Sequence, residues 1–461
     1  MTQRTALVHG IAVTGEALAR ALVARGWTVV LADDAPTAAK RAFAASLRTA
    51  LVESPRAERL VELVGAVDMV CPAPGVPETH PLIHGAVAAG VPVRTEIDLA
   101  YEWEQLRPGG PRPMLAITGT DGKTTTTMMT THMLAAAGRH PAAVGNTEVP
   151  LVAALAGDAD VFVVECSSFR LNWLTSFRAE AAVWLNLAPD HQNWHASPGT
   201  YAAAKARIWA NRRSGDVAIG NADDPVVSLA LTAAGGVTRT FGTARADHVG
   251  ADYTVADGRL MGPMGPIADV AALSRALPHD ITNALAAAAL VLETGLGTVA
   301  EVAAALADFR HPPHRIEPLG EIGGVRWYND SKATSPHAAL TAIRGFERIV
   351  LLAGGRNKGL DLASLATEHE RVRAVVALGE AASEVAAVFA AHCPVQMATD
   401  MGDAVRRGAA LAEPGDVVLL SPACASFDWY PDGGYPARGE DFRRLVAGLR
   451  EEVASDDSSS R

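Results

Sequence analysis

The stretch that decides the fold is "MLAITGTDGKTT" at residues 114–125. Its apolar start is typical of a buried strand, which enters a turn with Gly119 and Gly122 before Lys123 and Thr124 open the helical pattern "KTTTTMMTTHMLAAAG". Such units bind polyphosphates, because glycines let backbone N–H groups converge on oxygen and the helix N-terminus adds partial positive charge. Lys123 adds a full charge, and Thr124 can reach a magnesium ion. We therefore expect a nucleotide triphosphate site in an α/β domain, the alternative being that the threonines merely cap a helix.

The stretch is close to a Walker A loop but does not match it. The pattern GxxxxGK[ST] requires a glycine five places before Gly122, where this chain has Ile117. The site is therefore a more compact variant of the phosphate-binding loop.

Two segments rich in proline divide the chain. They are "RPGGPRP" at 107–113 and "FRHPPHR" at 309–315, and clusters of this kind suit linkers better than helices or strands. A length of 461 residues favours about three domains. We place them at 1–110, 111–310 and 311–461.

All three parts alternate strand and helix patterns. The first opens with "TALVHG", a helical stretch and "TVVLADD", a βαβ start with too few glycines for the GxGxxG fingerprint, so no dinucleotide is expected there. Its glycines could equally serve only close packing of strand and helix. The third contains the strands "RIVLLAGG", "AVVALG" and "DVVLLSP". The fold class is α/β, with a Rossmann-like N-terminal domain, a central ATPase-like domain related to P-loop proteins, and a Rossmann-like C-terminal domain.

The composition excludes several classes of protein. A net charge of −11 argues against a nucleic-acid partner or anionic lipid surface, since both require a basic face. Four scattered cysteines indicate neither a disulfide framework nor a zinc site. Neither a signal peptide nor a membrane span is recognisable. We expect a cytoplasmic protein without membrane insertion that acts as a monomer on small molecules.

Polar residues follow two apolar strands of the central part. Glu165 ends "VFVVE" and His191 follows "VWLNLAPD", so both would face the crevice above Lys123. A single histidine at a strand end is more often structural, but the pair favours a metal site. Because Mg²⁺ prefers oxygen ligands, a histidine ligand suggests a second, less demanding ion site. Lys205, in the helical pattern 200–212, has the pattern of a solvent-exposed lysine.

The third part carries polar loops after its strands. Asp330, Lys332 and Thr334 share one loop, Lys358 lies in the glycine-rich turn "GGRNKG", and Ser426 follows the strand "DVVLLSP". Arg315, in the second proline-rich segment, could reach a nucleotide held by the preceding domain. Together these loops predict a cleft for several substrates with a nucleotide in the middle domain.

The chain resembles the Mur ligases, the ATP-dependent amide-forming enzymes of peptidoglycan precursor synthesis. The motifs that carry the resemblance are "GTDGKTT", "GNTEVP", "ECSSFRL", "NLAPDH", "YAAAKARI", "GNADD", "TNALAA", "PHRIE", "NDSKAT", "GGRNKG" and "SPACASFD" with a later "RGEDF". They occur in order over nearly the whole chain. "NDSKAT", the chain ending and the N-terminal βαβ unit are most similar to the branch that adds D-glutamate to UDP-N-acetylmuramoyl-L-alanine.

The resemblance implies roles for individual residues. ATP and its magnesium would be held by Gly119, Thr120, Asp121, Gly122, Lys123, Thr124 and Thr125, with Asn283, Arg315 and Asp330. A second Mg²⁺ would be surrounded by Glu165, His191 and Lys205, the last carbamylated, which overrides the interpretation of Lys205 as solvent-exposed. The UDP-linked substrate would contact Val13, Thr14, Asp34, Gly75, Asn146 and His191. Lys332 would steady the transferring phosphoryl group, and Thr334, Lys358, Ser426 and Tyr435 would bind glutamate.

Some residues depart from the family pattern. Asp34 and Ala35 replace a Thr-Arg pair, Asn193 stands where Asp is common, and "GNTEVP" lacks a second glycine. The segment 429–437 is longer than its counterpart, so the role of Tyr435 depends on where the insertion falls.

The implied reaction proceeds through an acyl phosphate, and His191 could instead accept a proton from the attacking amine. The alternatives are a Mur-type ligase for L-glutamate or another amino acid, a folylpolyglutamate-synthase-like ligase, or a nucleotide-regulated binding protein that has lost ligase chemistry. An N-terminal nucleotide-type βαβ unit disfavours the second, and intact Lys123, Glu165, His191, Lys205 and Lys332 disfavour the third.

Overall fold

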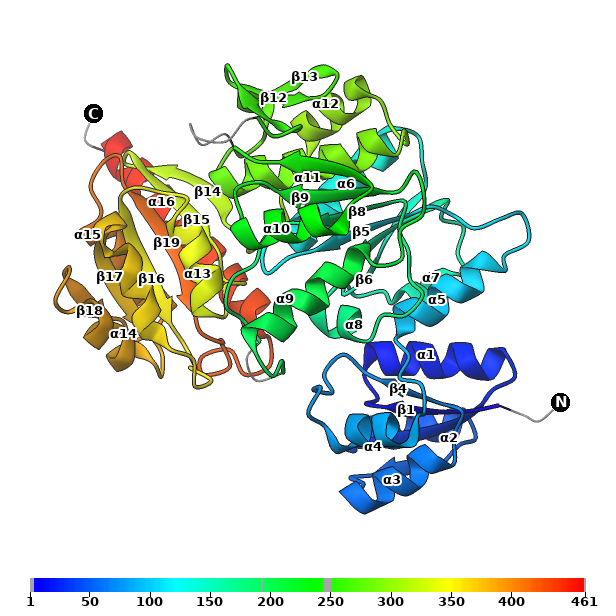
Figure 1. Cartoon of the computed structure of the whole chain (residues 1–461). Helices are drawn as coiled ribbons and strands as arrows, with labels where there is room; N and C mark the ends of the chain where they lie inside the picture. Colours follow the sequence, from blue (N-terminus) through cyan, green and yellow to red (C-terminus); the bar gives the residue numbers. More distant parts are fainter. Residues whose placement is uncertain (1–3, 192–193, 244–249, 460–461) are drawn as a thin grey trace. The chain divides into compact units, whose positions relative to one another are not determined.

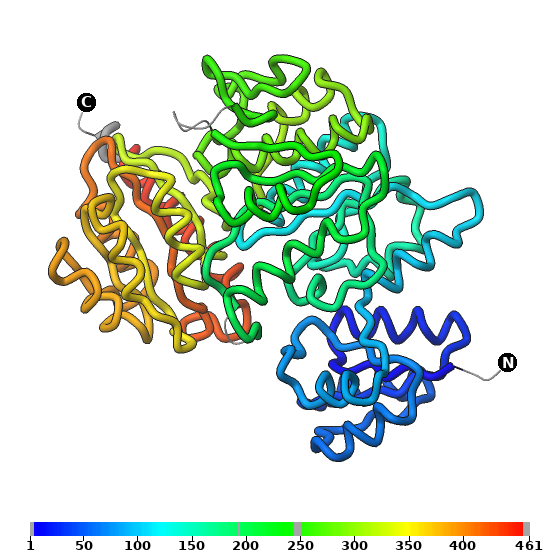
Figure 2. Tube along the Cα trace, viewed as in Figure 1, coloured from blue at the N-terminus to red at the C-terminus, as the bar shows by residue number. Residues whose placement is uncertain are grey.

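The computed structural model describes residues 4–191, 194–243 and 250–459. It divides into two compact units, Met1–Phe309 and Arg310–Arg461 (Figure 1). The second unit is one continuous run of chain, coloured yellow to red in Figure 2. Among the described helices, none is both long and apolar enough to cross a membrane. The further division of the first unit near residue 110 stays a prediction.

The first unit begins with a parallel sheet of order β3-β2-β1-β4. Its strands are β1 (Thr5–His9), β2 (Thr28–Asp33), β3 (Leu51–Glu53) and β4 (Met69–Pro72). The helices are α1 (Val13–Ala24), α2 (Ala38–Ser46), α3 (Ala57–Gly65), α4 (Pro81–Ala89) and α5 (Glu96–Gln105). Ala6 and Val8 of β1 belong to one hydrophobic cluster and Leu7 to another, so side chains cover both faces of the sheet.

A six-stranded parallel sheet follows, in the order β10-β9-β8-β5-β7-β6. Its strands are β5 (Met114–Thr118), β6 (Pro141–Gly145), β7 (Val161–Glu165), β8 (Ala181–Trp184), β9 (Val217–Asn221) and β10 (Val237–Phe241). The helices of this region are α6 (Lys123–Ala136), α7 (Leu151–Ala154), α8 (Ser168–Asn172), α9 (Pro198–Ala206), α10 (Pro225–Ala234), α11 (Pro278–Glu293) and α12 (Val299–Asp308), with 3₁₀ turns at Arg207–Trp209 and Val270–Ala272.

Strand β5 is central to this sheet and completely buried. Met114 and Ala116 pack into one hydrophobic cluster, and Leu115 and Ile117 into the cluster on the opposite face. This explains why the strand reads as a continuous apolar run rather than an alternating one. The strand delivers the chain to the turn at Gly119 at the carboxyl edge of the sheet, where ligands bind in open α/β folds.

A small antiparallel sheet in the first unit was not predicted. It consists of β11 (Thr254–Ala256), β12 (Arg259–Gly262) and β13 (Gly265–Asp269). These strands are only three to five residues long and are separated by glycine turns. Such short segments carry too little periodicity to be distinguished from loops.

The second unit contains one six-stranded sheet of order β14-β15-β19-β16-β17-β18, parallel except for the β14–β15 hairpin. Its strands are β14 (Glu317–Ile322), β15 (Val325–Asn329), β16 (Ile349–Gly354), β17 (Val372–Leu378), β18 (Val395–Met397) and β19 (Val417–Ala423). Its helices are α13 (Pro336–Ile343), α14 (Ala382–Phe389), α15 (Met401–Leu411) and α16 (Gly434–Ser459), with a 3₁₀ segment at Leu362–Arg371. Parallel sheets in both units confirm the predicted α/β class.

Candidate active site

The predicted phosphate loop lies between β5 and α6, and the N-terminus of α6 has no protein cap. The N-cap position is Gly122, which adopts φ of +79° and has no side chain to accept from the first turn. The first N–H groups of a helix have no intrahelical partner, and the helix dipole places positive potential there. The start of α6 therefore suits an anion.

Gly122 is required by its surroundings as well as by its backbone angle. A Cβ atom at this position would lie 2.4 Å from Oδ1 of Asn283 on α11. That same oxygen accepts a hydrogen bond from Oγ1 of Thr126 at 3.2 Å. Asn283, predicted to contact the nucleotide, thus lies directly against the loop.

Asn186, just beyond β8, fixes the shape of the loop. Its Oδ1 accepts from the backbone N–H groups of Thr120 at 2.9 Å and Asp121 at 2.8 Å. The Thr120 hydroxyl lies 3.0 Å from the hydroxyl of Tyr201. In the sequence, Asn186 belongs to the motif "NLAPDH", but no role was predicted for it. An amide is suitable here because it binds the loop without adding charge.

Two lysines converge on one carbonyl oxygen of the loop. Nζ of Lys123 donates to the carbonyls of Gly119 and Thr120, both at 2.8 Å, and Nζ of Lys205 donates to Gly119 at 2.7 Å. Lys205 is 1% exposed, so the interpretation of this residue as solvent-exposed is wrong. Burial, followed by the charge of Lys123, holds the pKa of Lys205 well below its usual range.

Glu165 ends β7 close to this loop and is 1% exposed. Its Oε1 accepts from Nδ2 of Asn146 at 2.9 Å, while the buried Oε2 has no hydrogen-bond partner among the described residues. An unpaired buried carboxylate oxygen is costly unless a ligand satisfies it. A hard divalent cation fits this oxygen, because carboxylate is the ligand that Mg²⁺ prefers.

His191 follows β8 in a left-handed backbone conformation, with φ of +54°. Its ring packs 4.6 Å from the ring of Phe169, and its Nε2 lies 3.3 Å from Oδ2 of Asp190. Burial lowers the pKa of His191, and Lys123 and Lys205 lower it further against the opposing effect of Asp190. The lowered pKa favours the neutral imidazole, which either metal ligation or proton acceptance requires. The family departure noted at Asn193 lies outside the described residues.

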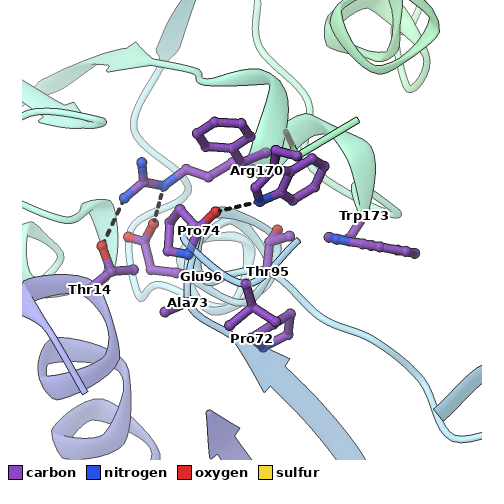
Figure 3. Close-up of a pocket in the computed structure, with 11 residues that line it drawn as sticks. Thr14, Pro72, Ala73, Pro74, Thr95, Glu96, Arg170 and Trp173 are labelled. Atoms are coloured by element: carbon purple, nitrogen blue, oxygen red, sulfur yellow. Dashed lines mark hydrogen bonds and ion pairs between the residues drawn. The ribbon is translucent and has the colours of Figure 1, made fainter. Parts of the chain in front are cut away.

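Arg170 of α8 was not predicted, yet it links three parts of the first unit (Figure 3). Its guanidinium donates to Oγ1 of Thr14 at 2.9 Å and to Oδ1 of Asn146 at 3.0 Å. Buried Glu96 provides a counter-charge at 3.5 Å. Because Asn146 then bonds Glu165, a polar chain runs from the first turn of α1 to the candidate metal carboxylate. Only its place in "ECSSFRL" could have singled out Arg170.

The pocket beside Arg170 is lined by residues of α1, of the end of β4 and the segment after it, of the start of α5, and of α8 and the segments after it. They are Thr14, Pro72, Ala73, Pro74, Val76, Thr95, Glu96, Phe169, Arg170, Trp173 and Trp194. Nε1 of Trp194 donates to the carbonyl of Pro74 at 3.1 Å, which closes one side of the pocket (Figure 3). Of the predicted uridine residues, Thr14 lines this pocket, whereas Val13, Asp34 and Gly75 lie exposed at the carboxyl edge of the first sheet.

In the second unit, the loop after β15 carries three predicted residues. Oδ2 of Asp330 accepts from Oγ of Ser421 at 2.8 Å, and Nζ of Lys332 lies 5.3 Å above the ring of Tyr435. Thr334 is half-buried in the same loop. Tyr435 lies in the first turn of α16, so the longer segment 429–437 leads into this helix. Lys332 and Tyr435 therefore lie close to one another.

Arg438, which was not predicted, supports that loop from α16. Its guanidinium donates to the hydroxyl and carbonyl of Ser331 and to the carbonyl of Cys424. It is 2% exposed, and burial lowers its pKa to about 10. A buried arginine saturated with hydrogen bonds is a rigid support rather than a ligand for substrate.

The remaining predicted residues of the second unit lie on two paired loops. Arg356 and Ala425 exchange backbone hydrogen bonds of 2.8 and 3.1 Å, which places the loop of Lys358 beside that of Ser426. Lys358 is exposed, with its ammonium 5.6 Å above the ring of Phe427, while Ser426 is buried. Arg315 is half-buried between His314 and Ile316, which both have positive φ.

Comparison with known proteins agrees over both units. Residues 117–291 match the Mur ligase middle domain, and residues 314–424 match the Mur ligase glutamate ligase domain. The UDP-N-acetylmuramoylalanine–D-glutamate ligase of Frankia casuarinae is 45% identical, covering 95% of this chain and 93% of the relative. The protein of the same name from Pelotomaculum thermopropionicum is 36% identical, covering 97% and 98%.

The solved structures show the same fold at much lower sequence identity. The MurF ligase of Thermotoga maritima, determined in complex with ADP, superposes with a TM-score of 0.59 at 16% identity. The superposition covers 99% of this chain and 96% of that one.

Proposed function

The chain belongs to the Mur ligase family, and from this premise we propose that it joins D-glutamate to UDP-N-acetylmuramoyl-L-alanine with hydrolysis of ATP to ADP and phosphate. The observation that carries the proposal is the convergence of Lys123 and Lys205 on the Gly119 carbonyl, just before the start of α6, which has no side-chain cap. Relatives that are named for this activity align with the chain over almost their full length, and this similarity supports the proposal.

ATP is needed because a carboxylate does not react with an amine at neutral pH. In the first step an oxygen of the alanyl carboxylate attacks the γ-phosphorus, the bond to the β-phosphate oxygen breaks, and ADP leaves. In the second step the amine nitrogen of glutamate attacks the acyl carbon, inorganic phosphate leaves, and the nitrogen loses a proton. The first step brings several anions together, so the protein must supply positive charge in fixed positions.

The loop at Gly119–Thr125 would hold the phosphates. The N–H groups at the start of α6 would contact phosphate oxygens, and Lys123 would neutralise charge on the transferring group. Asn186 occupies the N–H groups of Thr120 and Asp121, so these serve the shape of the loop instead. Asn283, beside Gly122, would contact the nucleotide.

Thr124, Glu165, His191 and Lys205 would hold two Mg²⁺ ions. The unsatisfied Oε2 of Glu165 and the neutral imidazole of His191 fit that role. When bound, the ions supply charge neutralisation for the phosphates and the attacking carboxylate. We assign His191 to the metal, because it follows β8 while Glu165 ends β7, so both lie at the carboxyl edge of the same parallel sheet.

Lys205 would act as a carbamate rather than as a free amine. Only a neutral amine attacks CO₂, and the lowered pKa of Lys205 provides one. Its nitrogen bonds the carbon of CO₂, a C=O electron pair passes to oxygen, and the nitrogen loses its proton to solvent, so that a carbamate anion replaces the neutral amine. The product places a negative charge beside Lys123, which shares the Gly119 carbonyl with Lys205.

The substrates would be divided between the two units. We propose that Val13, Thr14, Asp34, Gly75 and Asn146 contact the UDP-linked substrate. Arg315 and Asp330 would contact the nucleotide, Lys332 the transferring phosphoryl group, and Thr334, Lys358, Ser426 and Tyr435 glutamate. Lys358 offers a cation for a carboxylate of glutamate. The proposed compartment is the cytoplasm and the proposed state a monomer.

The proposal is tested by offering D- and L-glutamate separately. With ATP, Mg²⁺ and UDP-N-acetylmuramoyl-L-alanine, purified protein should sustain ADP release over many turnovers when D-glutamate but not L-glutamate is added, and mass spectrometry should show one added glutamyl residue. Hydroxylamine, added in place of glutamate, should trap the acyl phosphate as a hydroxamate. Turnover with L-glutamate alone would favour the alternative ligase, and absence of any hydroxamate would remove the acyl-phosphate mechanism.

A further inference from the structure

A compact cluster outside the phosphate loop involves two histidines and one aspartate. Nε2 of His9, at the end of β1, and Nε2 of His80, which precedes α4, both contact Oδ2 of Asp34, at 3.1 and 3.2 Å. The two imidazole rings lie 4.9 Å apart. His9 is 1% exposed, whereas the Asp34 side chain is 54% exposed. We call this the His9–Asp34–His80 cluster.

The neighbouring carboxylate shows that Asp34 has a separate task. Asp33 is 3% exposed and accepts from the N–H groups of Ile11 and Ala35 and from Nζ of Lys40. The Asp33 carboxylate is therefore occupied by hydrogen bonds within the protein, which hold the glycine turn in place. Asp34 alone presents a carboxylate outward from the end of β2.

The hydrogen bonds define which nitrogen of His80 carries a proton. Its Nδ1 accepts from the backbone N–H of Leu82 at 3.2 Å and so caps α4. In the neutral ring the proton must then lie on Nε2, which donates to Asp34. His9 points its Nε2 at the same acceptor, so it also donates. One carboxylate oxygen is thereby fixed by two N–H donors.

A bound metal ion is a poorer explanation of the same geometry. The ligand atoms are within 4.8 Å of one another, close enough to surround an ion. A metal on Nε2 of His80 would move the proton to Nδ1, where it would face the Leu82 N–H and remove the helix cap. The buried Nδ1 of His9 also has no partner among the described residues, although metal-bound histidines normally donate from that nitrogen.

We propose that His9 and His80 are positioning residues that orient the carboxylate of Asp34, so that its other oxygen accepts a hydrogen bond from the nucleoside end of the UDP-linked substrate. This inference rests on the proposed function. Asp34 follows the glycine turn by about 20 residues and stands at the end of the second strand, the place where Rossmann-type domains put the acid that reads a ribose hydroxyl. On a uridine nucleotide, the donors are the ribose hydroxyls and the imide N–H of the base.

The two histidines together hold the Asp34 carboxylate in one orientation, which a single side chain could not do. A carboxylate that is half exposed would otherwise rotate freely in water, and ordering it would reduce the affinity gained on binding. Two donors on one oxygen fix the direction of the second oxygen before the ligand arrives. The expected signature is an effect on binding of the UDP-linked substrate, with little effect on the chemical steps.

The test compares substitutions that separate this role from general stability. His80→Asn keeps a side chain able to cap α4 but cannot reach Asp34, His9→Leu removes the other donor, and His9→Gln restores an N–H donor. Asp34→Asn can turn an amide N–H outward in place of the acceptor. The exposed His84→Asn, on the same helix as the His80 cap, is the control.

We expect Asp34→Asn to raise KM for the UDP-linked substrate about tenfold, and His80→Asn or His9→Leu to raise it several-fold. KM for ATP and glutamate and kcat should change less than twofold, His9→Gln should recover most of the affinity, and His84→Asn should match the parent. Equal losses in all kinetic parameters, or no loss in Asp34→Asn, would overturn the proposal.

Calorimetry with UDP, 2′-deoxy-UDP and N3-methyl-UDP identifies the group that donates to Asp34. The analogue that lacks this donor should bind the parent more weakly than UDP does, but should bind Asp34→Ala with the same affinity as UDP. Binding of UDP can be measured even in the absence of turnover, so failure of the proposed function would be distinguished from failure of this inference. Titration with Zn²⁺ alone completes the test: a tight site lost in His9→Leu would show that the cluster is a metal site and overturn the inference.

Discussion

Two strand–turn–helix units of the first compact unit use the same backbone plan with opposite charge. At β1–α1 the backbone donor of Ile11 is taken by the Asp33 carboxylate, and Asp34 follows. At β5–α6 the corresponding donors are taken by the neutral amide of Asn186, and two lysine side chains meet at the Gly119 carbonyl. Neither helix has a side-chain cap.

The difference teaches that the glycine turn alone does not decide which part of a ligand is bound. The acidic first turn suits the hydrogen-bond donors of a nucleoside, and the basic second turn suits a triphosphate. Arg170, which belongs to α8, brings a positive charge to Thr14 at this first turn. Substitutions that alter the charge of one turn should therefore leave binding of the other turn's substrate largely unaffected.

The largest effect is expected for Lys123→Met, which keeps side-chain length but removes the charge on the phosphate loop. We expect ADP release to fall by at least ~10³-fold, because a preorganised cation on a transferring phosphoryl group contributes on that scale. Arg139→Met removes an exposed cation just beyond the other end of α6 and should keep its activity. Comparable losses in both variants would show that the position of the charge is unimportant.

Lys205→Ala should reduce turnover by roughly 10²- to 10³-fold, since it deletes the proposed carbamate ligand. Short carboxylic acids such as acetate should restore part of the activity by occupying the space with an oxygen ligand. Lys205→Arg, which cannot form a carbamate, should stay inactive with bicarbonate. Steady-state rates with and without additive measure this, and full activity of Lys205→Ala in plain buffer would contradict the assignment.

Arg170→Gln should raise KM for the UDP-linked substrate about tenfold or more and leave KM for ATP nearly unchanged. It also leaves Glu96 buried without its counter-charge, which should lower the free energy of unfolding by about 3–5 kcal/mol. The double variant Glu96→Gln/Arg170→Gln should recover stability in thermal melts without recovering KM. If KM followed stability in both variants, Arg170 would have only a structural role.

The sequence predicted the strands and the phosphate loop because they are long apolar runs ended by glycine, and these patterns are local. It could not show that Lys205 is buried, because small neighbours on a helix fit an exposed lysine equally well. Arg170 and Asn186 act through contacts with residues far away in the chain. Periodicity cannot reveal such partners. The short strands β11–β13 were not predicted, because they carry too little periodicity.

The lysine content of the chain is a further sequence signal for the candidate site. The chain has 40 basic residues but only five lysines, Lys40, Lys123, Lys205, Lys332 and Lys358. Four of these are candidate site residues, and Lys40 supports the first turn through Asp33. Lysine is a compact cation whose pKa shifts readily, so a chain that otherwise uses arginine retains it where those properties matter.

Gly122→Ala and Gly138→Ala form a matched pair at the two ends of α6. Both glycines have positive φ, +79° and +73°, so each substitution should cost about 1 kcal/mol of stability. Only at Gly122 would the new Cβ approach Asn283, whereas nothing lies within 4 Å at Gly138. We expect Gly122→Ala alone to raise KM for ATP, about tenfold. Equal KM values would show that the loop tolerates the displacement of Asn283.

The smallest effect concerns pH and the buried histidine of the first unit. His195 is 3% exposed and bonds the Ser168 hydroxyl at 2.9 Å; burial lowers its pKa, although Glu78 opposes the shift. Below pH 6.5, the ordinary histidine value, the unfolded chain then binds more protons than the folded one. The free energy of unfolding should therefore fall as the pH falls below 6.5 and be retained above it. Denaturant titrations of the parent and His195→Gln between pH 7.5 and 5.5 should show a shallower fall in the variant, by up to about one proton. An unchanged slope in His195→Gln would mean that this imidazole is protonated in the folded state as readily as in the unfolded one.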